Sequence, residues 1–146
     1  MSASLPLGWR VRAVASALTI APLPNVASLA RLGRWLGRAG PAATNGRSAD
    51  APPDDQVVAD WVSGLLRRLP WPWRYTCLRR SLVLYHLLRR AGRAVELRVG
   101  VRKESDGALA AHAWLVRDGA PYLEPDPAMP GRFSVIARLP ETQGSP

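Results

Sequence analysis

The chain has very few of the residues that build disulfide frameworks and metal centres. Its 146 residues include one cysteine, Cys77, and two histidines, His86 and His112. A single cysteine excludes an intramolecular disulfide framework and a cysteine-rich zinc site. The two histidines do not have the spacing of a metal-ligand cluster. The sequence therefore predicts neither a metal ion nor another cofactor.

Long hydrophobic runs are also scarce. An uncharged run near the N-terminus, AVASALTIAPLPNVASLA, is interrupted by prolines, and its unbroken apolar part covers only residues 13–21. A membrane span needs about 20 apolar residues. We therefore expect a helix ended by a proline turn, in place of a span or a signal peptide, and a cytoplasmic protein.

Lysine is nearly absent, because 19 of the 20 basic residues are arginine and the net charge is +9. Residues 1–50 hold six arginines and a single acid, Asp50. Charge of this sign allows an acidic partner, a nucleic acid or an anionic membrane, although such lopsided arginine usage also follows from genomic base composition. The arginines are spread over every predicted helix without a DNA-binding motif. We expect no nucleic-acid partner, while membrane association stays open.

The first two thirds of the chain have the apolar periodicity of helices. A 3.6-residue period, with proline or glycine at the ends, predicts four helices. They cover Leu7–Ile20, Val26–Arg38, Gln56–Leu69 and Cys77–Arg90. We divide the chain into an N-terminal helical region (1–39), a polar linker (40–55), a main domain (56–140) and a tail (141–146).

After Gly92, which should end the fourth helix, the period changes from 3.6 to 2. This alternation predicts strands over Ala94–Val101, Ala111–Val116 and Ala120–Glu124. The tail from Arg132 carries one short apolar run, FSVIARL. Helices followed by strands indicate an α+β fold with an antiparallel sheet.

Cys77 lies at the predicted N-terminus of the fourth helix. Thr76 is a suitable N-cap, so the thiol should lie beside free backbone N–H groups and the positive end of the helix dipole. Arg74, Arg79 and Arg80 add positive charge. This setting favours the thiolate, the reactive form of cysteine. The alternative role is that of a small buried hydrophobic residue, and a nearby base would decide between the two.

His112 is the candidate base. His86 lies nine residues after Cys77 on the same helix, roughly on the opposite side and about 13 Å along the axis. His112 begins the apolar strand HAWLV, where a lone histidine is more often structural. A cysteine at a helix N-terminus and a histidine on a later strand nevertheless match a nucleophile–base pair.

The hairpin after this strand decides which acid faces His112. A two-residue loop, 118–119, sets His112 opposite Pro125, and a three-residue loop, 117–119, sets it opposite Glu124. We prefer the three-residue loop, because it places glycine at its third position and pairs two aromatic residues across the strands.

Glu124 is therefore the expected partner of His112. Asp126 is the alternate acid, since it lies on the same face two residues later. A solvated turn is the alternative role of both acids.

Three segments together resemble a known family: TCLRRSLVLYHLLRRAG, a strand ending in VGV, and AHAWLVRDGAPYLE. They are similar to the transglutaminase-like cysteine proteases of lasso-peptide biosynthesis, the leader peptidases of that pathway. The resemblance covers roughly residues 57–138. It implies a papain- or transglutaminase-like core, with a catalytic helix on an antiparallel sheet, and a Cys–His–acid triad. Cys77 and His112 match the first two positions, and Glu124 stands where the family commonly has aspartate.

The resemblance also implies the reaction, which is removal of the leader from a ribosomally made lasso precursor peptide. Cys77 would attack the scissile carbonyl, His112 would transfer the proton, and Glu124 would fix the tautomer. The Cys77 backbone N–H would be one oxyanion donor, with the Trp73 indole as a second candidate or a core residue. Acyl transfer to an amine and a non-enzymatic basic binding module are the competing functions.

Family members act with a winged-helix-like recognition domain, fused or separate, and with an ATP-dependent cyclase. No strand pattern precedes the main domain, so we expect the recognition domain to be a separate protein. The helix Val26–Arg38, with Arg31, Arg34 and Arg38 on one side, is a candidate docking surface for that protein or the cyclase. Its alternative role is packing against the main domain.

Overall fold

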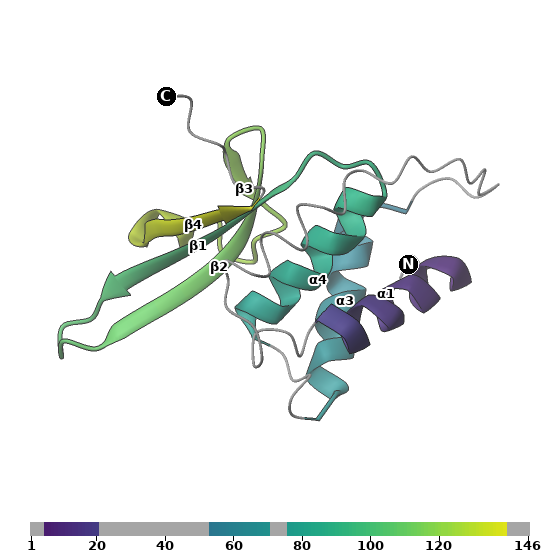
Figure 1. The fold of residues 1–146 in the computed structure, drawn as a ribbon, viewed down its shortest axis with the longest axis horizontal. Coiled ribbons are helices and arrows are strands. Elements are labelled where there is room, and N and C mark those ends of the chain that lie inside the picture. The colour runs from purple at the N-terminus through teal and green to yellow at the C-terminus, as the bar shows by residue number, and fades with distance from the viewer. Residues whose placement is uncertain (1–4, 21–52, 71–75, 140–146) are drawn as a thin grey trace.

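The computed structural model describes residues 5–20, 53–70 and 76–139. Within these residues, three α-helices precede a four-stranded antiparallel sheet (Figure 1). The predicted α+β class is confirmed. The helices are α1 (Leu7–Ile20), α3 (Asp55–Arg68) and α4 (Cys77–Arg90), and the strands are β1 (Glu96–Lys103), β2 (Leu109–Arg117), β3 (Ala120–Tyr122) and β4 (Ser134–Leu139), with a 3-10 helix, η2 (Pro130–Arg132), before β4.

The sheet has the strand order β3-β2-β1-β4. β1 and β2 form a long hairpin that extends away from the helices (Figure 1). The apolar run FSVIARL, to which the sequence analysis assigned no strand, supplies β4, which pairs with the free side of β1. β1 itself begins two residues later than predicted and ends two residues later.

Helix α4 is the centre of the fold. It lies between the sheet, which it contacts through β1 and β2, and the other two helices, α1 and α3 (Figure 1). Nine of its fourteen residues are therefore buried, even though several of them are polar. The sheet turns an apolar face toward α4, made by Leu97, Val99, Ala113 and Leu115.

The ends of α4 follow from its capping residues. Thr76 Oγ1 accepts a hydrogen bond of 3.1 Å from the backbone N–H of Arg79, as an N-cap should. Gly92 has a φ of +83°, the left-handed conformation that commonly follows a helix. The predicted bounds of α4 are thus confirmed. The N-cap of α3 is Asp54, so this helix starts at Asp55, one residue earlier than predicted.

The β2–β3 hairpin differs from the prediction. Leu115 pairs with Tyr122 and Arg117 with Ala120, so the loop contains only Asp118 and Gly119. Both loop residues have positive φ, +52° and +79°, which is the signature of a type I′ turn. The predicted three-residue loop and its strand register are wrong, because the local preference for a two-residue turn outweighed the aromatic pairing. β3 also ends at Tyr122, two residues earlier than predicted.

Several predictions concern residues outside the described ranges. They include the helix Val26–Arg38 with its three arginines, most of the linker, Arg74, Trp73 and the tail 141–146. Among the described helices, none has the length and apolar character needed to cross a bilayer.

Candidate active site

A small cavity of about 40 Å³ lies at the N-terminal end of α4. It brings together the three residues that the sequence predicted to act together, although they come from α4, β2 and the segment after β3. Its walls are Cys77, Arg80, Ser81, His112, Ala113, Glu124 and Pro125.

Cys77 is the first residue of α4 and is half-buried. One helical turn later, Ser81 donates a hydrogen bond of 3.1 Å to the carbonyl oxygen of Ala113. Because Ala113 follows His112 on β2, this fully buried bond fastens the start of α4 to the strand that carries the histidine. The Cys77 backbone N–H belongs to the first helical turn, whose N–H groups have no acceptor within the helix.

His112 and Glu124 form the polar contact of the cavity. Glu124 Oε1 lies 3.2 Å from His112 Nε2, and the two side chains are 7% and 17% exposed. A carboxylate only accepts hydrogen bonds, so it selects the tautomer with the proton on Nε2. His112 Nδ1 is then the ring nitrogen with a free lone pair, which is the form that a base requires.

Two aromatic rings hold the imidazole from its other sides. The Trp114 ring is stacked on it, with 5.8 Å between the ring centroids and an interplanar angle of 16°. The Phe133 ring is tilted against it, with 5.4 Å between the centroids. Gly100 is the β1 partner of His112 and leaves the room that these rings occupy. A Cβ on Gly100 would lie 2.8 Å from Phe133 Cβ and 3.0 Å from Trp114 Cη2, closer than carbon atoms approach. The glycine of the VGV segment is therefore part of the site.

Glu124 reaches His112 because the chain turns sharply after β3. In a regular continuation of the observed register, Glu124 would be opposite Ala113 and would point to the wrong face of the sheet. Leu123 has a φ of +57°, a left-handed conformation that costs a non-glycine residue roughly 1–2 kcal/mol. This residue redirects the chain and places the carboxylate beside the imidazole.

The two arginines in the first turn of α4 are buried, and Arg80 lines the same cavity as Cys77. Arg79 and Arg80 are 7% and 5% exposed. Arg80 Nη2 donates to the carbonyl oxygen of Leu123 at 2.8 Å, and Arg80 Nε donates to Ser63 Oγ on α3 at 2.8 Å. Arg80 thus binds two neutral oxygens within the protein and links α4 with α3 and the segment after β3.

Asp126, the alternate acid, takes another position. It is exposed, and its Oδ1 accepts a hydrogen bond of 3.1 Å from the backbone N–H of Ala128. This is the local bond of an aspartate in a turn. Trp73, the second oxyanion candidate, lies outside the described residues.

A second polar cluster surrounds Asp55, which the sequence analysis placed in the linker. Its buried carboxylate accepts from the Tyr122 hydroxyl at 2.5 Å and from Arg93 Nε at 3.1 Å, and Arg117 lies 3.7 Å away. Burial, and then the bond to Asp55, raises the pKa of Tyr122. The cluster joins the start of α3 to the β2–β3 hairpin directly before Leu123. Sequence periodicity gave no signal for it, because its members are far apart in the chain.

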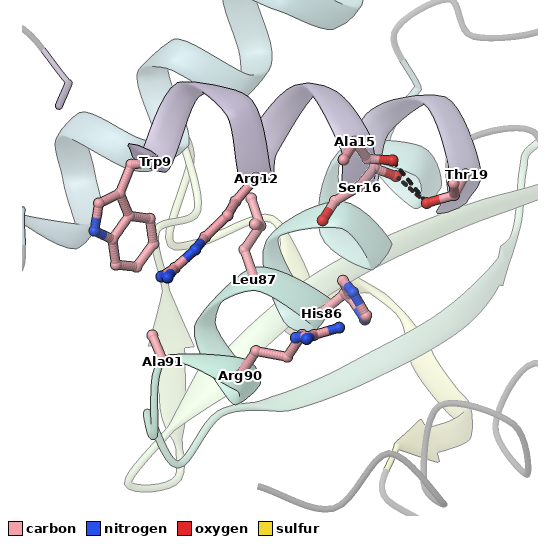
Figure 2. A pocket seen from close by; sticks show the side chains of 9 residues that line it. All are labelled: Trp9, Arg12, Ala15, Ser16, Thr19, His86, Leu87, Arg90 and Ala91. Atoms are coloured by element: carbon pink, nitrogen blue, oxygen red, sulfur yellow. Dashed lines mark hydrogen bonds between the residues drawn. The ribbon is translucent and has the colours of Figure 1, made fainter. Parts of the chain in front are cut away.

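His86 lies in a different cavity, as its position on the helix predicted. This cavity, of about 350 Å³, separates α1 from the C-terminal half of α4 (Figure 2). Burial, with a smaller contribution from the charge of Arg90, lowers the pKa of His86. The walls are Trp9, Arg12, Ala15, Ser16, Thr19, His86, Leu87, Arg90 and Ala91.

Among the described residues, no group of three His, Cys, Asp or Glu side chains has the geometry of a metal site. A family model described as Transglut_core3, the transglutaminase-like superfamily, matches residues 20–138. Neither a curated protein nor a solved structure matches the chain.

Proposed function

The chain belongs to the transglutaminase-like superfamily, and on this premise we propose that it is a cysteine peptidase that removes the leader from a ribosomally made lasso precursor peptide. The superfamily supports the coarser statement, a cysteine-dependent peptidase or acyltransferase. The similarity of the Cys77 and His112 segments to the lasso leader peptidases supports the narrower proposal.

One observation carries the proposed chemistry. Cys77, at the N-terminus of α4, shares its cavity with His112, and Glu124 bonds Nε2 of the same imidazole. A thiol, a base and a carboxylate in this order form the constellation of nucleophilic acyl transfer.

In the proposed mechanism, His112 Nδ1 takes the proton of the Cys77 thiol, and the thiolate attacks the scissile carbonyl. The tetrahedral oxyanion accepts a hydrogen bond from the Cys77 backbone N–H. The C–N bond then breaks, the imidazolium protonates the leaving amine, and a thioester remains on Cys77. Water, deprotonated by His112, hydrolyses the thioester and returns the thiol. Glu124 keeps the proton on Nε2 throughout and stabilises the imidazolium.

We also propose that the protein acts in the cytoplasm and obtains its specificity from a separate leader-recognition protein of the winged-helix-like type. The precursor peptide is the substrate, and the cyclase that consumes the freed peptide is a further candidate partner. This division of labour predicts that the chain alone cleaves the precursor poorly and that the recognition protein restores cleavage.

The test is cleavage of the precursor encoded beside this gene, with the separate recognition protein present and the products identified by mass spectrometry. Cys77→Ala and His112→Ala should lose cleavage by at least about 10²-fold while their circular dichroism stays native. His86→Ala, on the other cavity, is the matched control and should keep activity. Full cleavage by Cys77→Ala would overturn the peptidase proposal.

The alternative acceptor of the acyl group on Cys77 is an amine, as in an acyltransferase. The two reactions differ by the mass of the product, because hydrolysis leaves a free carboxylate on the leader and amine transfer leaves an amide. Adding a primary amine such as cadaverine to the assay would reveal transfer directly.

A further inference from the structure

Arg80 is a buried cation that contacts the segment carrying Glu124, the acid of the site. Its guanidinium donates to the Leu123 carbonyl and to Ser63 Oγ, both at 2.8 Å. The Ser63 hydroxyl in turn donates to the Ala59 carbonyl at 2.8 Å. The guanidinium is therefore fixed from two sides, by α3 and by the chain after β3.

The orientation of the Leu123 carbonyl affects the position of Glu124. Leu123 is the left-handed residue that turns Glu124 onto His112. An unfavourable backbone conformation persists only where its surroundings enforce it. The bond from Arg80 supplies that restraint, since it fixes the peptide between Leu123 and Glu124.

We propose that Arg80 is a positioning residue, which keeps the Leu123–Glu124 peptide oriented so that Glu124 stays on His112 Nε2. This proposal rests on the proposed peptidase function. It adds a positioning role to the positive charge near the thiol that the sequence predicted, since Arg80 also lines the cavity of Cys77.

The test is a double-mutant cycle with Arg80→Met and Glu124→Gln, assayed by precursor cleavage. Arg80→Met should lower kcat by about 10²-fold, the effect of a misplacement of about 1 Å, and should leave KM nearly unchanged. In the Glu124→Gln background the same change should cost less than about threefold, because Glu124 has already lost its function. Additive losses would overturn the proposal.

Arg80→Lys keeps the charge but cannot hold both oxygens with one planar group. It should retain the native circular dichroism and lose part of kcat, which keeps the proposal testable where Arg80→Met fails to fold. Arg93→Met is the matched control, since Arg93 binds the Asp55 carboxylate and not the Leu123 carbonyl, and it should lower the melting temperature with little loss of kcat in the folded protein.

A measurement that does not depend on catalytic activity tests the positioning role independently of the peptidase function. The ring 15N signals of His112 should show the proton fixed on Nε2 in the wild type and shared between both nitrogens in Arg80→Lys. An unchanged tautomer in a folded variant would overturn the positioning role even where activity is lost. An inactive wild type with the expected tautomer change would instead count against the peptidase function alone.

The cavity between α1 and α4 carries an independent inference, because two arginines contribute positive charge to its walls. Arg12 and Arg90 line it from opposite helices (Figure 2). Within the described part of the chain, neither forms an ion pair. The imidazole of His86 lines the same cavity and is half-buried.

The other walls of this cavity are apolar or carry hydroxyls. Trp9 and Leu87 provide an aromatic and an aliphatic surface, and Ser16 provides a hydroxyl group. A guanidinium binds a carboxylate through two parallel N–H groups, and an indole face accommodates an apolar group beside it. Arg12 and Arg90 are both exposed, so their guanidinium groups are accessible to a carboxylate of another molecule.

We infer that this cavity binds an organic carboxylate attached to an apolar group, either a small molecule or an acidic side chain of a peptide. Two probes distinguish the sources: phenylacetate, and an acetylated pentapeptide with a glutamate between leucines. Binding is followed through the His86 ring signals in NMR titrations. Phenethylamine, which has the same ring and the opposite charge, is the control ligand.

A bound carboxylate should raise the pKa of His86 by stabilising the imidazolium. Phenylacetate, the peptide or both should saturate, and Arg12→Gln with Arg90→Gln should weaken binding by at least about tenfold. Arg132→Gln, far from this cavity, is the matched control variant. The inference would be overturned if phenylacetate and phenethylamine bound equally weakly. It would also be overturned if the Arg12→Gln, Arg90→Gln double variant were still saturated by phenylacetate or the peptide.

Discussion

His112 and Glu124 are hydrogen-bonded at 3.2 Å, although a regular continuation of the β2–β3 register would place Glu124 opposite Ala113. The left-handed conformation of Leu123 reconciles these two facts, because it changes the direction of the chain after β3 and so brings the Glu124 side chain to His112. The acid of the site therefore depends on a backbone irregularity and not on regular strand pairing.

Glu124→Gln should reduce kcat by about 10²-fold, because an amide cannot stabilise the imidazolium as a carboxylate does. Asp126→Asn should change kcat by less than about twofold, since the Asp126 carboxylate is exposed and accepts the local bond from the backbone N–H of Ala128. Cleavage assays of the two variants provide the comparison. A larger loss for Asp126→Asn would show that the acid is misassigned.

The sequence was sufficient where local physics decides the structure. The bounds of α4 follow from Thr76 as cap, an apolar period and Gly92, and they place Cys77 at a helix N-terminus. The exclusion of His86 as the base needs only helix geometry, and the structure puts His86 in the α1–α4 cavity. Both predictions use residues that are close in the chain.

The sequence was insufficient where distant segments meet. The contact of Glu124 with His112 was expected from a three-residue loop that does not exist, so the right pair came from a wrong register. The role of Arg80 depends on Leu123, 43 residues later. No periodicity encodes a guanidinium that bonds a carbonyl so far along the chain, and the same holds for the cluster around Asp55.

Gly100 should be intolerant of any side chain. In Gly100→Ala the new Cβ would contact the backbone oxygen of Ser134 at 3.1 Å as well as Phe133 and Trp114. Overpacking of this kind costs about 1–3 kcal/mol, and displacement of the two rings should also release His112. We expect a lower melting temperature and a lower kcat together.

Gly64→Ala is the control for this substitution. Gly64 lies within α3, where an added Cβ meets no atom within 4 Å. Alanine should stabilise the helix by about 0.5–1 kcal/mol. If Gly100→Ala were as stable and as active as Gly64→Ala, the aromatic walls of His112 would not depend on Gly100.

Asp55→Asn should destabilise the protein by about 2 kcal/mol, because it leaves the partly buried Arg93 without its counter-ion and weakens the bond to Tyr122. Tyr122→Phe removes the hydroxyl alone and should cost about 1 kcal/mol. Urea unfolding measures both. The two losses should not add in the double variant, since the substitutions share one bond; full additivity would show that the cluster does not act as a unit.

Acidification should destabilise the protein through His86. Burial, and to a lesser extent the charge of Arg90, lowers the pKa of this histidine in the folded state. The unfolded chain has the ordinary value of about 6.5 and binds the proton more readily. The contribution of His86 to stability is thus fully present above this value and is lost as the pH falls through it toward the folded pKa.

His86→Gln removes the titration while it keeps a polar side chain between α1 and α4. Urea unfolding from about pH 7.5 to about pH 5.5, on either side of the ordinary histidine value, should give a shallower fall in unfolding free energy for His86→Gln than for the wild type. The difference between the two curves isolates His86 from every other titrating group, including His112. Parallel curves would show that His86 has the same proton affinity in the folded and unfolded states. In that case, neither burial nor the charge of Arg90 would lower its pKa.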